Sequence, residues 1–346
     1  MTVATKERKL TIARAMAEAI AQEMRIDEKV FVMGEDVGPL GGVFGNTRGL
    51  HEEFGTQRVR DTPISETAFM GAAVGAASDG MRPIVELMFV DFFGVCFDAI
   101  YNLMAKNTYF SGGEIPVPVV LMTSTGGGYS DGGQHSQCLH ATFAHLPGMK
   151  VVAPSNAYDA KGLMTAAIRD NNPVIFMFNK ALQGMGWLGT EKDAIVHVPE
   201  EAYEVPIGKA AVVREGSDVT IVGITSGVHH GLKAARALAE RGISAEVVDL
   251  RSLVPLDRET VLASVRKTGR LIVVDEDYQS YGMSGEIISS VAEQGVTMKA
   301  PPQRVAFPDI IIPFAPVMEQ WALPSADKII AAFEKMQTME TRQDEY

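Results

Sequence analysis

Short apolar runs alternate with helical patterns along the whole chain, and this alternation restricts the fold more than any other feature of the sequence. The runs VFVMGED, PIVELMF, VPVVLMT, MKVVAP and PVIFMF are bounded by turn residues, as expected for strands of a parallel sheet that is covered on both faces. Helical patterns lie between them at residues 12–24, 66–78, 92–106 and 159–170. The sequence therefore predicts βαβ units with right-handed crossovers.

A second series of the same kind follows a change in composition. Residues 184–204 lose periodicity and gain charge, which is typical of a linker. After them come the strand DVTIVGI, the helix GVHHGLKAARALAERG with its glycine stop, the strand AEVVDL, a helix from Asp257 and the strand LIVVDED. We expect an α/β protein with two doubly wound, mainly parallel-sheet domains, since 346 residues are enough for two cores. The predicted boundaries are a first domain at 1–190, a linker at 191–204, a second domain at 205–337 and a loose polar tail at 338–346.

Composition and charge exclude several classes of protein. No apolar run approaches the roughly 18 residues of a membrane helix, and even VELMFVDFFGVCF is broken by Asp91. The segment MTVATKERKL has no apolar stretch behind it, so a secretory signal is not expected and the cytoplasm is the default location. Cys96 and Cys138 lie outside any CxxC pattern and are interpreted as buried fillers. The net charge of -12 argues against a nucleic-acid partner.

The loop TSTGGGYSDGGQHSQ, which follows the strand VPVVLMT, has glycines that would let a backbone approach a phosphate. Neither GxGxxG nor GxxxxGK fits it, because Asp131 stands where the third dinucleotide glycine belongs and no lysine follows. The segment GGVFG near Gly41 is also out of register. A nicotinamide-dependent dehydrogenase therefore remains an alternative, but the sequence has no phosphate-binding motif that supports it.

Glu66 is a carboxylate beside a run of small residues, in DTPISETAFMGAAVGAA. Pro63 favours an extended approach, Ser65 is a good N-cap, and Glu66 then falls in the first helical turn. There it complements the helix dipole, worth roughly 0.3 to 1 kcal/mol. The small residues at 71–77 would let another backbone pack closely and exclude water, and a carboxylate at the edge of such a contact needs a specific partner. A helix-dipole role and a functional role both remain open.

Six ordered blocks carry a resemblance to a known family. RVRDTPISETAFMGAAVGAA, LMFVDFFGVCFDAI, GGQHSQ, FAHLPGMKVVAPSNAYDAKGL, IRDNNPVIF and AEVVDLRSLVPLD resemble the beta subunit of the thiamine-diphosphate-dependent decarboxylating component of 2-oxo acid dehydrogenase complexes. Beta chains of pyruvate, branched-chain 2-oxo acid and acetoin dehydrogenases belong to this family. The resemblance runs from about residue 12 to residue 332. It implies a pyrimidine-binding thiamine-diphosphate domain followed by a transketolase C-terminal-like domain.

The resemblance also implies roles for individual residues. Glu66 is similar to the glutamate that bonds the pyrimidine ring nitrogen, which favours the cofactor tautomer that can deprotonate the thiazolium ring. Ile64 resembles the residue whose backbone meets the cofactor, while Met88 and Phe92 resemble the wall against the pyrimidine ring. His135 resembles the histidine that orients or protonates substrate-derived intermediates. Core packing for Met88 and Phe92, and a capping role for His135, are the alternatives.

The block AIRDNNPV resembles the potassium loop of this family. The resemblance implies a hard monovalent cation held by oxygens. The expected ligands are Asp170, Asn172 and backbone carbonyls near Val119, Ala167 and Ile168. An ordinary helix end followed by a proline-bounded turn is the alternative.

The sequence has no GDG block, the motif that holds magnesium and diphosphate in thiamine-diphosphate enzymes. The resemblance therefore implies a separate alpha subunit that supplies Mg²⁺ and the diphosphate half of the site, in a heterotetramer of two alpha and two beta chains. The expected substrate is a small 2-oxo acid or acetoin, with the acyl group passed to the lipoyl arm of an acyltransferase core. A noncatalytic assembly subunit is the remaining alternative.

Overall fold

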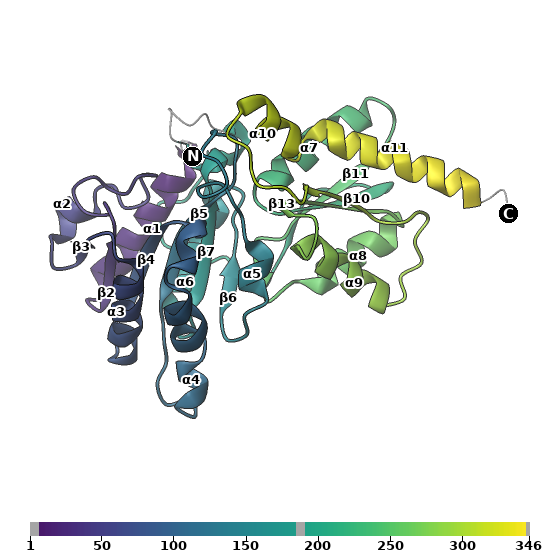
Figure 1. The fold of residues 1–346 in the computed structure, drawn as a ribbon. Coiled ribbons are helices and arrows are strands. Elements are labelled where there is room, and N and C mark those ends of the chain that lie inside the picture. Colours follow the sequence, from purple (N-terminus) through teal and green to yellow (C-terminus); the bar gives the residue numbers. More distant parts are fainter. Residues whose placement is uncertain (1–6, 185–190, 344–346) are drawn as a thin grey trace, which may run out of the picture. The chain divides into compact units, whose positions relative to one another are not determined.

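The computed structural model describes residues 7–184 and 191–343 (Figure 1), and within them the chain forms two units. The first unit contains the described residues up to 88, together with 92–124 and those within 156–207. The second unit contains 89–91, 125–155 and the described residues from 208 onward. Each unit thus collects separate segments of the chain. The predicted domain boundaries followed the order of the sequence and stay a prediction.

The first unit is built on a sheet with the strand order β7-β5-β4-β2-β3. These strands are β2 (Val30–Gly34), β3 (Val59–Asp61), β4 (Arg82–Phe89), β5 (Val120–Thr125) and β7 (Val174–Asn179). β2 pairs in parallel with both β3 and β4. Every residue of β2, β5 and β7 is buried, which explains why β2 and β7 read as mainly apolar runs.

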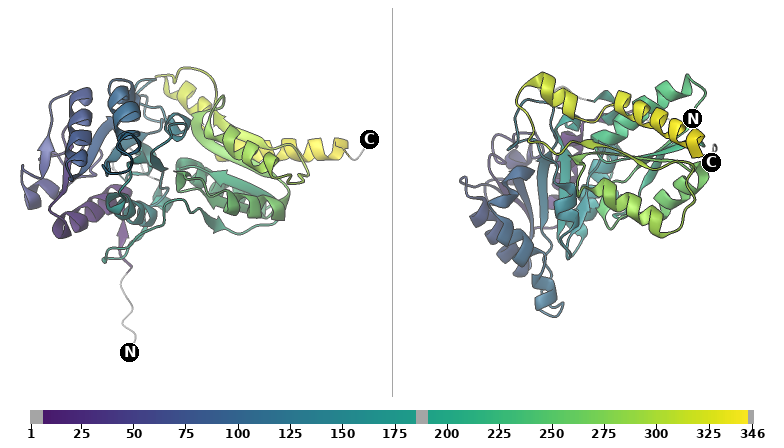
Figure 2. Two further views of the ribbon diagram at one scale, coloured as in Figure 1. Left: turned by 90° about the horizontal axis from the view of Figure 1, so that it is seen from below. Right: turned by 45° about the vertical axis from the view of Figure 1, so that its right-hand side comes forward.

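Helices cover both faces of this sheet. α1 (Ile12–Ile26) packs against α6 (Ala157–Arg169), and α3 (Glu66–Ser78) packs against the π-helix η2 (Ala99–Met104). Figure 2 shows the two pairs on opposite faces of the sheet. Shorter helices are α2 (Leu50–Phe54), α4 (Asn107–Phe110), η3 (Lys180–Leu182) and η4 (Lys192–Ala194).

The helix predicted at residues 92–106 is present only as interrupted, irregular helical segments. The 3₁₀ turn η1 (Val90–Gly94) comes first, and η2 begins only at Ala99. Gly94 is a poor helix former. The hydroxyl of Thr67 on α3 donates to the carbonyl of Val95 at 2.6 Å, so that carbonyl bonds a neighbouring helix in place of a regular helical ladder.

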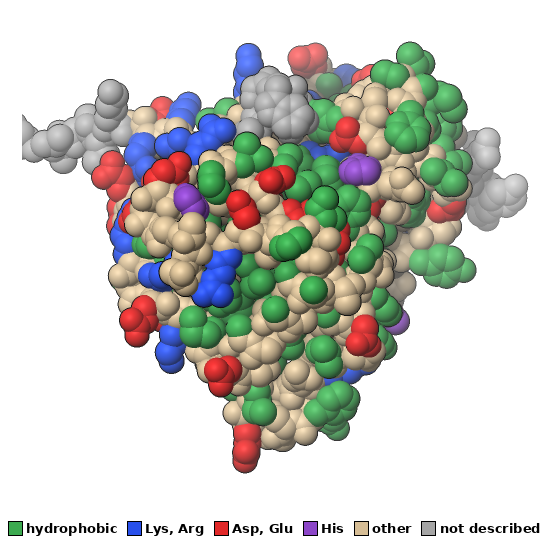
Figure 3. Space-filling view, turned by 60° about the vertical axis from the view of Figure 1, so that its left-hand side comes forward, with side chains coloured by type: hydrophobic (Ala, Val, Ile, Leu, Met, Phe, Trp, Pro, Cys, Tyr) green, Lys and Arg blue, Asp and Glu red, His purple; other side chains and the backbone are tan. Residues whose placement is uncertain are grey.

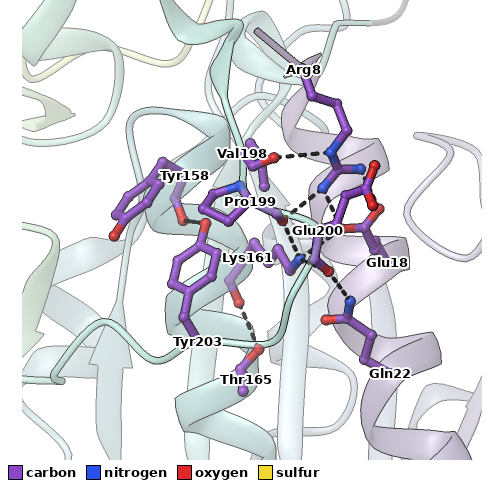
Figure 4. Close-up of polar contacts among 10 residues, drawn as sticks. All are labelled: Arg8, Glu18, Gln22, Tyr158, Lys161, Thr165, Val198, Pro199, Glu200 and Tyr203. Atoms are coloured by element: carbon purple, nitrogen blue, oxygen red, sulfur yellow. Dashed lines mark hydrogen bonds and ion pairs between the residues drawn. The ribbon is translucent and has the colours of Figure 1, made fainter. Parts of the chain in front are cut away.

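The predicted linker is tied to the first unit by a buried ionic network (Figure 4). The Nζ of Lys161, a side chain with no exposed surface, donates to Glu18 Oε1 at 2.7 Å and to the carbonyl of Pro199 at 2.6 Å. Arg8 holds the same Glu18 carboxylate with two hydrogen bonds of 2.7 and 2.8 Å. Beside the network, the short strands β1 (Lys9–Leu10) and β8 (Val196–His197) pair antiparallel. A segment without sequence periodicity is therefore fixed by side chains of α1 and α6.

Replacing Lys161 with methionine should destabilise the first unit by about 3 kcal/mol, at the lower end of the cost of breaking a buried ion pair. The expected loss of stability lies at the lower end of this range because Arg8 still neutralises Glu18. Chemical unfolding followed by circular dichroism measures it. The control is Arg241→Met, which breaks the half-exposed pair with Glu334 and should cost less than about 1 kcal/mol. Equal losses for the two variants would contradict the prediction.

The second unit has a five-stranded sheet in the order β14-β13-β10-β11-β9. The strands are β9 (Ala211–Arg214), β10 (Val219–Gly223), β11 (Ala245–Asp249), β13 (Leu271–Tyr278) and β14 (Gln303–Phe307). All its pairings are parallel except that of the edge strand β9. The prediction of two doubly wound, mainly parallel α/β sheets is confirmed. β6 (Lys150–Val152) and β12 (Ser252–Val254) pair antiparallel.

Four helices cover this second sheet, two on each face (Figure 1). α7 (Ser226–Ala239) and α11 (Ala326–Gln343) lie on one face, and α8 (Arg258–Thr268) and α9 (Met283–Glu293) lie on the other. The short helices α5 (His140–Ala144) and α10 (Pro316–Ala322) complete the unit. Because α11 continues to Gln343, the tail that was expected to be loose from residue 338 is helical as far as that residue.

The described helices include none that is both long enough and apolar enough to span a membrane. On the face drawn in Figure 3, acidic and basic side chains lie among one another, and apolar side chains reach the surface between them.

Candidate active site

Glu66 is the first residue of α3, and only 8% of its surface is exposed. Ser65 does not cap the helix through its side chain, because its hydroxyl donates to the carbonyl of Pro63 at 3.0 Å. Ser65 thus occupies the predicted N-cap position, but without the capping hydrogen bond from its side chain. The Glu66 carboxylate itself stands at the positive end of the helix dipole. A buried acid thus lies at a helix N-terminus, two residues after Ile64, whose side chain is 85% exposed.

Glu35 is a second buried carboxyl in the same place, and the sequence analysis missed it. It directly follows β2. Burial raises the pKa of Glu35, and the negative charges of Glu66 and Asp36 raise it further, while the backbone amide of Ser65 donates to Glu35 and opposes the rise. Two neighbouring carboxyl groups of this kind can hold and exchange a proton. Glu35 could have been identified from the sequence, because the triplet GED places two acidic residues at the carboxyl end of a predicted strand.

Met88 lies near the end of the adjacent strand β4, and Phe92 lies in the turn η1 that follows it. The register of β2 and β4 pairs Gly34 with Glu86, so the carboxyl ends of both strands meet at one edge of the sheet. Met88 and Phe92 are half-buried there, and the Met88 carbonyl accepts a hydrogen bond of 2.6 Å from Ser124. The first unit therefore places apolar side chains at the sheet edge that also carries Glu35.

Cys96 has no reactive character in this setting. Burial raises the pKa of its thiol to about 12, and the charge of Glu66 adds to the rise. A protonated thiol is a poor nucleophile, so the interpretation of Cys96 as a filler agrees with its surroundings.

The residues expected around potassium lie at the end of α6 and beside β5 and β7. Asp170 ends α6, and its carboxylate accepts hydrogen bonds of 2.9 Å from the backbone and the side chain of Asn172. Arg82 donates to the carbonyls of Ile168 at 2.9 Å and Asp170 at 2.6 Å. The Val119 carbonyl accepts from the amide of Val174 at 2.9 Å. The carbonyl oxygens of Ile168 and Asp170 therefore already bond one cationic group, the guanidinium of Arg82.

His135 belongs to the second unit, in the glycine-rich loop at residues 126–138. The amide of Gly126 donates to the carbonyl of Gln137 at 3.1 Å, which closes the loop at its base. The half-buried imidazole packs edge-on against the ring of Phe89, with 4.7 Å between the ring centroids. His135 thus stands on a compact loop and not on a regular element.

A buried histidine that the sequence analysis did not single out lies just beyond this loop. His140 begins α5, and its Nδ1 lies 2.8 Å from Asp275 Oδ1. Burial acts to lower the pKa of His140, but the charge of Asp275 and the hydrogen bond to it prevail and raise the pKa. Asp277 lies beside them, and its two oxygens accept the amides of Ala141 and Tyr278. Because Asp275 Oδ1 and both oxygens of Asp277 are already bonded within the protein, we interpret the cluster as a buried ion pair.

The ion pair predicts a pH dependence of stability. His140 has a raised pKa in the folded chain, so its contribution is complete below the ordinary value near 6.5 and is lost as the pH rises through the folded value. The pKa of Asp277 is also raised, first by burial and then by the charge of Asp275, which lowers stability in the same direction. The free energy of unfolding lost in His140→Gln should therefore be larger at pH 6 than at pH 9. A loss that is independent of pH in urea titrations would contradict this interpretation.

The chain matches two known families along most of its length. Residues 8–184 match the family described as "Transketolase, pyrimidine binding domain", and residues 208–329 match "Transketolase, C-terminal domain". A solved split-gene transketolase, described as an inactive beta4 tetramer, has a TM-score of 0.74 and covers 96% of this chain and 100% of its own, at 23% identity. The fold and the two matches define a transketolase-like protein.

Relatives with higher sequence identity define the family of this chain more closely. The chain is 48% identical to the beta subunit of acetoin:2,6-dichlorophenolindophenol oxidoreductase of Cupriavidus necator, over 95% of this chain and 97% of that protein. It is 46% identical to the mitochondrial pyruvate dehydrogenase E1 component subunit beta-1 of Arabidopsis thaliana, over 94% of this chain and 88% of that protein. The chain belongs to the family of acetoin and pyruvate dehydrogenase beta subunits, and the resemblance stated from the sequence blocks is confirmed.

Proposed function

We propose that this chain is the beta subunit of a thiamine-diphosphate-dependent enzyme that decarboxylates a pyruvate-type 2-oxo acid or cleaves acetoin, and that passes the acyl group to a lipoyl arm. The observation that carries the proposal is the buried Glu66 carboxyl at the start of α3, next to the raised-pKa carboxyl of Glu35. A glutamate whose only role is to interact with the dipole of a surface helix would need neither burial nor a second carboxyl group beside it. Family membership supplies the reaction class.

The residues of the first unit fit the pyrimidine half of thiamine diphosphate. Glu66 would bond the ring nitrogen, the backbone at Ile64 would meet the ring, and Met88 and Phe92 would form its apolar wall. Glu35 would exchange a proton with Glu66, because burial and the neighbouring charge both raise its pKa. The cofactor, when bound, supplies the carbanion chemistry that the protein side chains lack. His135 would orient or protonate groups derived from the substrate.

The other half of the site is assigned to an alpha subunit. The sequence has no GDG block for Mg²⁺ and diphosphate. An added Cβ at Gly71 or Gly75 of α3 would meet nothing within 4 Å, so the small-residue face of this helix is open in the single chain. Large apolar side chains are also exposed on the segments that follow α3, namely Val95, Phe97, Leu103, Tyr109 and Phe110. Such surfaces are typical of obligate contacts, and we propose a heterotetramer of two alpha and two beta chains.

Potassium binding is a separate part of the proposal. The ligands would be Asp170, Asn172 and the carbonyls of Val119, Ala167 and Ile168. A carbonyl oxygen has two lone pairs, so the bonds of Arg82 to this loop leave room for coordination. We expect KCl to raise the Tm of the chain more than NaCl does at equal ionic strength, and Asp170→Ala to remove the difference. Equal Tm values in the two salts would contradict the potassium site.

Docking to an acyltransferase core and residence in the cytoplasm complete the proposal. The net charge of -12 would favour a basic subunit-binding segment of the acyltransferase. Binding of that kind should weaken as salt is raised.

The test is to purify the chain alone and with an alpha chain from the same genome. Thiamine-diphosphate binding is then measured by calorimetry, and turnover is measured with pyruvate, branched-chain 2-oxo acids and acetoin. We expect weak binding and negligible turnover for the single chain, and full activity for the assembled complex with pyruvate or acetoin. Full activity of the isolated chain, or none in the complex with any substrate, would overturn the proposal.

A further inference from the structure

A buried carboxylate and a half-buried carboxylate hold the beginning of the loop that carries His135. Glu319, a fully buried residue of α10, accepts the amide of Gly128 at 2.8 Å and the amide of Ser130 at 2.9 Å. Glu276, on β13, accepts the amide of Gly127 at 3.0 Å. Three backbone N–H groups of the loop therefore point at carboxylates that the protein itself provides.

This arrangement explains why the loop resembles a phosphate-binding loop without being one. Successive backbone amides in a glycine-rich turn form a concave site that attracts an anion. Here the anion is the side chain of Glu319, and a Cβ added at Gly127 would lie 3.1 Å from its Oε1. The short loop side chains let the carboxylate approach, and the charge-assisted hydrogen bonds are of the strong kind.

The far part of the loop is also fixed within the second unit. Asp91 accepts from the side-chain amide of Gln137 at 2.9 Å, and Gly126 bonds Gln137 across the base of the loop. An added Cβ at Gly132 would come within 2.4 Å of the ring of Phe314, so this part of the loop has no space to move inward. His135 lies between the two held ends, and its backbone position depends on both.

We infer that Glu319 is a positioning residue for His135: it takes the place of a bound anion and holds the loop in the conformation from which His135 acts. The inference rests on the proposed role of His135 and extends it to a residue 184 positions further along the chain. Glu319 touches neither cofactor nor substrate in this assignment. Its effect passes through the backbone of residues 128–130.

The experiment uses Glu319→Gln in the complete complex with the alpha subunit. Glutamine keeps the shape, but it replaces one acceptor oxygen by an NH₂ group that faces a backbone donor. Substrate turnover should fall roughly 10- to 100-fold, as expected when a catalytic group is misplaced. Exchange of the cofactor thiazolium proton, which depends on Glu66, should stay within about twofold of wild type, and amide hydrogen exchange at Gly128 and Ser130 should become faster.

Asp257→Asn is the matched control. Asp257 is also buried in the second unit, and its carboxylate accepts the backbone amides of Ala210 and Thr260. This variant loses the same kind of interaction away from the loop, so it should lower stability without lowering turnover. If Asp257→Asn and Glu319→Gln lower turnover equally, Glu319 has only a structural role and the inference is overturned.

A double-mutant cycle tests whether Glu319 acts through His135. In a His135→Ala complex, Glu319→Gln should lower turnover by less than about twofold further, because the group that it positions is already absent. Fully additive losses would overturn the inference. These outcomes can be distinguished from a failure of the proposed function. An inactive wild-type complex would contradict the proposed function. An active wild-type complex with normal turnover in Glu319→Gln would contradict only this inference.

Discussion

Glu66→Gln should lower thiamine-diphosphate-dependent turnover of the assembled complex by at least about 100-fold, the loss typical of an acid–base group. Glutamine keeps the size of the side chain at the start of α3 but cannot exchange a proton with Glu35 or with a ring nitrogen. The thiazolium proton of the bound cofactor should also exchange more slowly with deuterium. Steady-state kinetics and exchange followed by NMR are the measurements, with circular dichroism to show that the variant is folded.

The control for Glu66 is a glutamate that has only the helix-dipole role. Glu259 is exposed in the first turn of α8, so Glu259→Gln removes the same dipole interaction, worth roughly 0.3 to 1 kcal/mol. We expect its complex to keep normal turnover. If Glu66→Gln behaves like Glu259→Gln, then Glu66 is a dipole partner and the proposed function loses its main support.

The second large effect is expected from Gly75→Leu on α3. An added Cβ meets nothing within 4 Å in the single chain, and leucine is a better helix former than glycine by almost 1 kcal/mol. The variant chain should therefore fold at least as stably as wild type. If α3 packs closely against an alpha subunit, the leucine side chain will block that contact. Analytical ultracentrifugation should then show failure of heterotetramer assembly, and thiamine-diphosphate-dependent activity should disappear.

Gly285→Leu is the matched control for this substitution. Gly285 is also a helical glycine with nothing within 4 Å of an added Cβ, on α9 of the second unit. We expect this variant to assemble and to remain active. A Gly75→Leu chain that assembles normally would show that the open face of α3 is not the contact with the alpha subunit.

Local patterns were sufficient to predict α3 and its acid. Pro63 and the pair Asp79–Gly80 mark the two ends of the helix in the sequence, and the observed span Glu66–Ser78 agrees with the predicted 66–78. The buried strands were equally visible, because most of their residues are apolar. The prediction was therefore correct for α3 and for the buried strands, whose conformation is determined by residues close together in the sequence.

The features that the sequence did not reveal depend on residues distant along the chain. The pKa of Glu35 is raised first by burial and then by the charge of Glu66, 31 positions later. The irregular helix after η1 depends on the bond from Thr67, and the role of the glycine-rich loop depends on Glu276 and Glu319. Single-sequence patterns carry no information about which of these partners meet.

The buried network around Glu18 limits how far the protein can be shortened at its amino end. Deleting residues 1–10 would remove Arg8 and β1, and with them the two hydrogen bonds that Arg8 makes to Glu18. Lys161 alone would then neutralise that carboxylate, and β8 would lose its only pairing partner within the described residues. A shortened gene for expression should therefore begin no later than the codon of Arg8, and an affinity tag belongs before that codon.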